Sequence, residues 1–222
     1  MTDNFIEEFK NSETWKKYEE QERAKEKYLK SGPNVVHFEY LGPLFTDQDI
    51  SEFENKLEDV GLELSRFDRN GTMYASLDNY QLVVYLVIAQ PLIGQLIQGV
   101  ATNAIWDIIK YILLSSWRKL KNQTYTRATS QQSKKKEISF GLKVKLDKNT
   151  SFNIKLDGDI EESVIESSLD KVLNFIGEQK LNESFKHADL VFLDKETNKW
   201  KKVDVEKEIR KMAANSRLKR KK

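Results

Sequence analysis

Apolar and polar residues alternate with a period of two in several parts of the chain, which is typical of strands with one buried face. The clearest alternation predicts a hairpin with a turn at 147–150. Its apolar positions are Ile138, Phe140, Leu142, Val144, Leu146, Phe152, Ile154 and Leu156. Weaker patterns predict a strand at 35–41, a hairpin around Asn70-Gly71 and a third hairpin at 190–203.

Apolar residues spaced three and four apart predict amphipathic helices between these strands. Thr46 and Asp49 have the spacing of a capping box, and the helix that they begin should end near Gly61. By the same argument, Asp159 should cap a helix that ends at Gly177.

The first 31 residues predict one long charged helical arm, because good helix formers fill 3–31 and the first Gly and Pro come at 32 and 33. Apolar residues are sparse in this arm, which suits a helix that reaches toward a partner rather than lying in a core. Trp15 and Tyr18 are its candidate contact residues.

The most apolar stretch runs from 79 to 117 and has no charged residue between Asp78 and Asp107. Its β-branched beginning, at 82–89, predicts a buried central strand, and the apolar pairs that follow Pro91 predict one long helix to Trp117. The same stretch supports an alternative hypothesis, in which 80–118 inserts into a membrane. Three glutamines and Pro91 lie where such a span would be driest, so the core helix is favoured.

Four side chains of this predicted helix are candidates for contact with a partner or a membrane. They are Ile105, Trp106, Ile109 and Trp117. Tryptophans would act as interface anchors, and the isoleucines would lie on the apolar face.

Together these patterns predict an α+β protein in which antiparallel β-hairpins pack against amphipathic helices, after a charged N-terminal helical arm. The expected units are the arm at 1–32, an α+β unit with the long apolar helix at 33–121, a polar linker at 122–136, a hairpin, helix and second hairpin at 137–204, and a basic helix and tail at 205–222.

Charge alters this picture only at the C-terminus. The chain has 37 basic and 35 acidic residues, but 199–222 alone has eleven basic residues against three acidic ones. The tail residues Arg217, Lys219, Arg220, Lys221 and Lys222 could contact nucleic-acid phosphates or anionic lipid headgroups. No aromatic residue is interleaved with them, so the tail offers no platform for base stacking.

Candidate catalytic chemistry is sparse. Cysteine is absent, which excludes disulfides and thiolate ligands, and the N-terminus has no export signal, so we expect a cytoplasmic protein. His37 should lie on the exposed side of its strand and His187 in a polar connection, and neither has a metal-ligand partner at suitable spacing. Nucleophile elbows and phosphate-binding glycine loops are absent from the sequence. We predict no catalytic residues, metal or cofactor, and an enzyme is the least favoured hypothesis.

The order of predicted elements from Val35 to Leu156 resembles that of the effector-associated constant component domains of bacterial conflict systems. The shared order is a strand, a capped helix, two or three strands, an apolar segment with glycines that runs into a helix ending at Trp117-Arg118-Lys119, and an alternating hairpin. The turn Asp147-Lys148-Asn149-Thr150 departs from the Asp-Gly turn expected there. The resemblance implies a non-catalytic adaptor that couples a sensor to an effector in antiphage defence. We therefore expect an interaction protein with a protein partner; the alternatives are a membrane-acting effector and a weak nucleic-acid binder.

Overall fold

The computed structural model describes residues 32–70, 82–99, 103–128, 133–146, 151–181, 189–194, 196–197 and 199–203, together with single residues at 13, 16, 20, 30 and 207. The predicted arm at 1–32, the turn at Asn70-Gly71 and the basic helix and tail at 205–222 therefore lie almost entirely outside the described residues.

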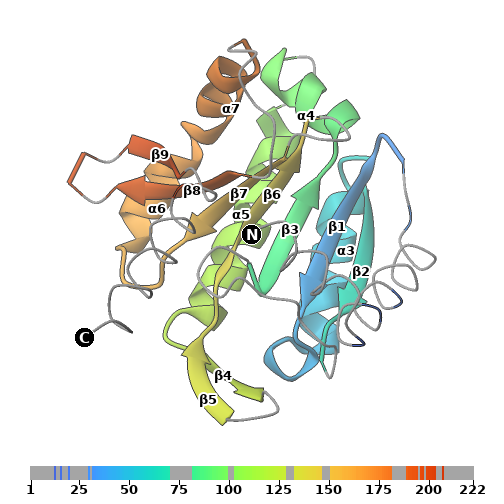
Figure 1. Ribbon diagram of the computed structural model, residues 1–222. Coiled ribbons are helices and arrows are strands. Elements are labelled where there is room, and N and C mark those ends of the chain that lie inside the picture. The colour runs from blue at the N-terminus through green and yellow to red at the C-terminus, as the bar shows by residue number, and fades with distance from the viewer. Residues whose placement is uncertain are drawn as a thin grey trace.

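A mixed seven-stranded sheet with the order β2-β1-β3-β6-β7-β8-β9 forms the centre of the molecule (Figure 1). Its strands are β1 (Val35–Tyr40), β2 (Glu63–Asp68), β3 (Val84–Ile88), β6 (Phe140–Lys145), β7 (Ser151–Leu156), β8 (Asp189–Asp194) and β9 (Lys199–Val203). The predicted hairpins β6–β7 and β8–β9 are confirmed as antiparallel pairs. The pairs β1–β2, β3–β6 and β7–β8 are parallel and were missing from the prediction, because parallel strands are joined through long connections rather than a local turn.

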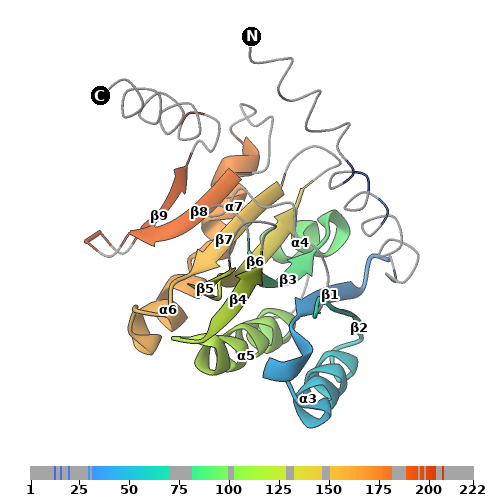
Figure 2. The same cartoon turned by 60° about the horizontal axis from the view of Figure 1, so that its bottom comes forward.

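Five α-helices in the described part of the chain form a layer on one face of this sheet. They are α3 (Asp47–Glu58), α4 (Gln90–Ile97), α5 (Asn103–Leu120), α6 (Glu162–Leu169) and α7 (Val172–Leu181), and a short 3₁₀ helix, η1 (Gly42–Leu44), precedes α3. Figure 2 shows α3, α5 and α6 together on one side of the sheet. The α+β class predicted from sequence is thus confirmed.

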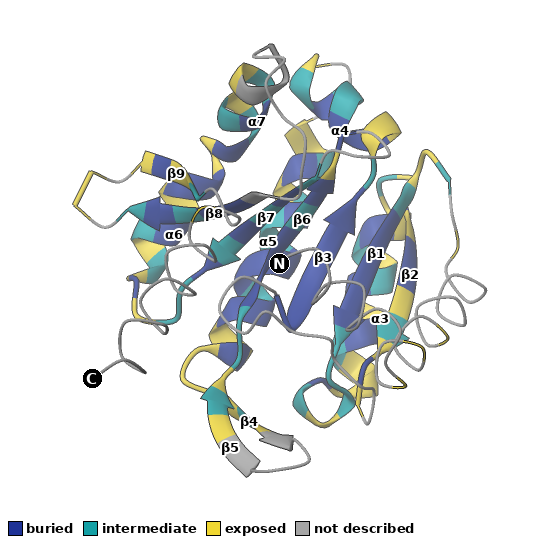
Figure 3. Ribbon diagram, in the orientation of Figure 1, coloured by how far each residue is buried: buried dark blue, intermediate teal, exposed yellow. Residues whose placement is uncertain are grey.

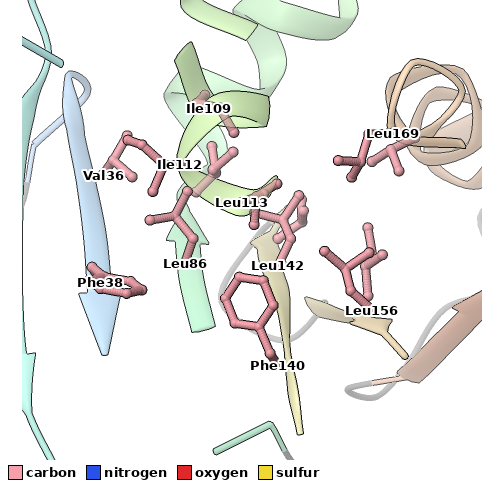
Figure 4. Close-up of a cluster of buried hydrophobic side chains, with 14 of the residues drawn as sticks. Val36, Phe38, Leu86, Ile109, Ile112, Leu113, Phe140, Leu142, Leu156 and Leu169 are labelled. Atoms are coloured by element: carbon pink, nitrogen blue, oxygen red, sulfur yellow. The ribbon is translucent and has the colours of Figure 1, made fainter. Parts of the chain in front are cut away.

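One continuous core lies between the helix layer and the sheet. Alternate side chains of the strands are fully buried there. Leu86 and Leu142 lie beside Leu113 of α5 (Figure 4), and the ring of Phe38 packs edge-on against Phe53 of α3. Burial of each such side chain contributes about 1.5–3 kcal/mol. This core therefore fixes which face of every strand points away from the helices.

The apolar stretch at 80–118 supplies the centre of this core. The predicted buried strand is confirmed as β3, but the prediction of a single helix to Trp117 is wrong, because the chain forms α4 and α5 with a break between them. Gly99 lies just after α4 with φ of 68°, a left-handed conformation that ends a helix. No helix within the described residues combines the length and apolar character needed to cross a bilayer.

Two further predictions are corrected by the structure. Most of the expected linker at 122–136 is an antiparallel pair, β4 (Thr124–Ala128) with β5 (Ser133–Glu137). This hairpin stands apart from the main sheet, so its mainly polar sequence lacks the alternation on which the strand predictions depended. The helix expected to end at Gly177 is instead divided into α6 and α7, and α7 runs through Gly177. A side chain there would approach Ile97 of α4 to 3.3 Å, so this glycine serves helix packing rather than helix termination.

Candidate functional site

Strand pairing places two rows of side chains on the face of the sheet opposite the helix layer, which we call the second face. From β2 to β9, the first row is Phe67, Glu39, Tyr85, Gly141, Lys155, Phe192 and Lys201. The second row is Ser65, His37, Val87, Lys143, Asn153, Leu190 and Val203. The rows divide the second face into an acid–base half at β1–β3 and a basic half at β6–β9.

A buried polar cluster occupies the acid–base half, with Glu39 at its centre. Glu39 is 2% exposed, and its two carboxylate oxygens lie 3.4 Å from His37 Nε2 and 2.9 Å from Arg69 Nη1. Arg69 Nη1 also donates a hydrogen bond to Tyr85 Oη over 3.1 Å. The cluster pairs a buried carboxylate with a buried guanidinium, which is the arrangement that makes burial of either charge tolerable.

His37 also approaches a hydroxyl on the neighbouring strand. Its Nδ1 lies 3.2 Å from Ser65 Oγ, which in turn accepts a hydrogen bond from the backbone N–H of Lys30 over 3.2 Å. Ser65, His37 and Glu39 contact one another in that order, which resembles a serine nucleophile with a histidine base and an acid that orients it. Ser65 is only 3% exposed, however, so its hydroxyl cannot attack a substrate from solution in this conformation. The arrangement instead links β1, β2 and the chain before β1.

The prediction that His37 lies on an exposed face is wrong. β1 lies between β2 and β3, and both faces of its central residues are buried (Figure 3). Alternation of polar His37 and Glu39 with apolar residues looks the same whether the polar face is solvated or buried in a paired cluster. The sequence of β3 could have distinguished the two cases. Every residue from Val84 to Ile88 is apolar or aromatic, so this strand requires cover on both faces, and the neighbouring strand β1 lies under the same cover.

The basic half of the second face is more accessible. Lys155 and Lys201 have side chains that are 33% and 52% exposed, and Phe192 lies half-buried on the strand between them. Each lysine has one acidic neighbour: Lys155 Nζ lies 2.7 Å from Asp157 Oδ1, and Lys201 Nζ lies 2.5 Å from Asp194 Oδ2.

Hydrogen bonds shift the proton equilibrium of one of these acids. Lys201 and, to a smaller extent, Thr197 hold the pKa of Asp194 below its ordinary value. Asp194 is therefore an anion at neutral pH and compensates part of the positive charge on this half of the face.

Lys143 joins the two halves of the second face. Its ammonium lies 5.6 Å from the ring centroid of Tyr85, close enough for a cation–π contact. The same tyrosine accepts the hydrogen bond from Arg69, so the buried cluster and the basic half share a side chain. The buried half can thus hold Tyr85, and through it Lys143, in a fixed position.

Three of the four candidate residues of the apolar stretch are buried. Ile109 and Trp117 lie in the core, Trp106 is buried on the same helix, and Ile105 is half-buried. Their apolar face meets the sheet, as a core helix requires. Trp15, Tyr18 and the tail residues Arg217, Lys219, Arg220, Lys221 and Lys222 lie outside the described residues.

A separate pocket of about 330 Å³ opens where the C-terminal end of α5 meets the ends of β5 and β7. Trp117 forms part of its wall: the indole N–H donates to the carbonyl oxygen of Asp157 over 3.1 Å, and Lys121 Nζ lies 4.7 Å from the ring centroid. Its rim carries Glu137, Asp157 and Asp159. Within the described part of the chain, no group of three or more His, Asp or Glu residues is arranged to hold a metal ion.

Comparison of the chain with protein-family models, with curated proteins and with solved structures found no match.

Proposed function

We propose that this chain is a non-catalytic interaction protein and that the basic half of the second face, on β6–β9, is its binding surface. The observation that supports the proposal is the division of the sheet into two faces. The described helices occupy one face, whereas the other presents Lys155, Phe192 and Lys201 on neighbouring strands. Side chains held on a paired sheet are well positioned for recognition, because the scaffold fixes their spacing.

The polar chemistry of the chain favours binding over catalysis. Glu39 and Arg69 are both buried and form an ion pair, and Ser65 already accepts a hydrogen bond. Removal of either member of such a pair would leave a buried charge without its counter-charge, so these groups have a structural role. By contrast, the lysines of the basic half are accessible to a partner.

The biological setting that we propose is an accessory role in bacterial antiphage defence, where the chain would contact an effector. Its support is the resemblance in the order of elements between Val35 and Leu156 to effector-associated constant component domains. The test is a plaque count on bacteria that carry the gene of the chain together with its native flanking genes. Loss of protection on deletion of the chain is the expected result, and unchanged plaque numbers would refute this setting.

Site-specific photocrosslinking in living cells tests the binding surface without assuming the class of partner. A photoreactive amino acid is introduced at Lys145 or Lys199, two exposed positions on the second face, and at Glu166 of α6 as the matched control on the helix layer. We expect both second-face positions to form the same adduct, the α6 position to form none, and Lys155→Glu to abolish the adducts. Equal crosslinking from all three positions, or none from the second face, would contradict the proposal.

A further inference from the structure

The strand register of the basic half places an aromatic ring between two positive charges. Phe192 on β8 pairs with Lys155 on β7 and with Lys201 on β9. Paired strands lie about 4.8 Å apart, so a lysine side chain begins on the strand at each side of the ring. In the sequence these residues are 37 and 9 positions apart, and nothing in their local pattern connects them.

The row beside this triplet adds polar and basic groups. Asn153 pairs with Lys143 and lies two residues from Lys155 on the same face of β7. Its amide has both donors and acceptors, and base edges are recognised by such groups. The surface thus combines a ring, an amide and three ammonium groups on four adjacent strands.

We propose that the basic half of the second face binds single-stranded nucleic acid, with a base stacked on Phe192 and with phosphates beside Lys155 and Lys201. This inference rests on the proposed function for the choice of surface and adds the class of partner. Proteins that bind single strands combine aromatic platforms with positive charge along the backbone. The basic tail lacks the aromatic part of this combination, whereas the sheet supplies it.

Single strands fit this surface better than duplex DNA or an acidic protein segment. The major groove of a duplex admits a helix or a two-stranded ribbon, whereas a sheet face with an aromatic ring suits unpaired bases. An acidic segment would use the lysines but would gain little from the ring. Asp157 and Asp194 repel any polyanion. A bound phosphate must therefore replace each carboxylate as the partner of its lysine ammonium group.

The test is fluorescence anisotropy of the full-length chain with 20-nucleotide oligo(U) and oligo(dT), titrated at several salt concentrations. Replacement Phe192→Ala should weaken binding by about 5- to 150-fold, the range that corresponds to loss of one stacked base. Phe192→Trp should retain it. Lys155→Gln or Lys201→Gln should each reduce the slope of log affinity against log salt by about 0.7, and Asp194→Asn should strengthen binding.

Matched variants separate this surface from general charge attraction. Lys171→Gln changes an exposed lysine at the start of α7 on the helix layer and should leave binding unchanged. A full-length variant with glutamine at the five basic tail positions reports the contribution of the tail, and circular dichroism verifies that Phe192→Ala is folded. Three results would each overturn the inference. They are absence of binding, binding that only the tail variant weakens, and an affinity for poly-glutamate equal to that for the oligonucleotides together with no effect of Phe192→Ala. A protein adduct in the crosslinking experiment combined with no oligonucleotide binding would retain the proposed surface and reject this partner.

Discussion

Glu39 is the residue at which the sequence and the structure diverge most. In the sequence it is one of 35 acidic residues and looks like surface charge, yet it lies between His37 and Arg69 inside the second face. Its partner Arg69 comes from just beyond β2, which is parallel to β1, and the prediction did not contain this pairing. A buried ion pair formed across such a connection has no local signature in the sequence, so the acid–base half could not be predicted.

Replacement Glu39→Ala should lower the free energy of unfolding by about 3–5 kcal/mol, because it leaves the buried Arg69 guanidinium without its carboxylate. Urea denaturation measures the change. The control is Glu63→Ala on β2, whose carboxylate forms an exposed ion pair with Lys30 and should contribute less than about 1 kcal/mol. If the two substitutions have similar effects, the cluster is not a structural ion pair.

The second prediction at the residue scale concerns Asp49, whose capping box with Thr46 was predicted and is confirmed. Burial alone would raise the pKa of Asp49, but hydrogen bonds from Lys119 and Thr46 outweigh it and hold the pKa below its ordinary value. The stabilisation is therefore complete above the unfolded pKa of about 3.9 and is lost as the pH falls through the lower folded pKa.

Asp49→Asn should accordingly lower the free energy of unfolding by about 1 kcal/mol at pH 6, and the difference from the original chain should shrink toward zero as the pH falls through the folded pKa of Asp49. Urea midpoints across this range measure it. Asp47→Asn in the same first turn of α3 is the matched control for a change of charge near the helix terminus. A difference between Asp49→Asn and the original chain that stays constant with pH would show that Lys119 and Thr46 do not favour the ionised carboxylate.

At the scale of elements, predictions succeeded where one face of an element is buried and failed where the cause was not local. The alternation in β6 and β7 and the capping box of α3 each report a local constraint, and both are confirmed. In the hairpin β4–β5, the residues at 124–126 and 135–137 are exposed or half-buried, and α6 and α7 divide at Asp170 and Lys171, where neither Gly nor Pro marks a helix end. Neither cause leaves a periodic apolar pattern for a sequence analysis to detect.

Two glycines of the apolar stretch should respond oppositely to the same substitution. Gly94 lies inside α4 with no atom within 4 Å of an added Cβ, so Gly94→Ala should stabilise the chain by up to about 1 kcal/mol. Gly99 has φ of 68°, where a side chain strains the backbone, so Gly99→Ala should destabilise it by about 1–2 kcal/mol. Thermal denaturation of the two variants measures both signs. If both stabilise the chain, α4 and α5 can join into the single helix that the sequence pattern suggested.

At the scale of the whole molecule, the sheet separates stability from recognition. One core cluster joins the five described helices to strands from β1 to β9, whereas the second face carries the buried acid–base cluster and the basic half. The sequence revealed the apolar face, because its periodicity follows burial. It did not reveal the proposed binding surface, because Lys155, Phe192 and Lys201 are assembled only when β7, β8 and β9 pair.

Because one core spans the sheet, a cavity at its centre should weaken the described fold as a unit. Ile109 of α5 is fully buried in the core, and Ile109→Ala should lower the free energy of unfolding by about 2–5 kcal/mol. The half-buried Ile105 on the same helix is the matched control and should lose clearly less. Tryptophan fluorescence reports Trp106 and Trp117 in α5 and Trp200 in β9, and circular dichroism reports all elements, so their urea transitions should coincide and shift together. Separate transitions in Ile109→Ala would show that β8–β9 folds independently of α5, and the basic half would then lack the rigid support on which its proposed role depends.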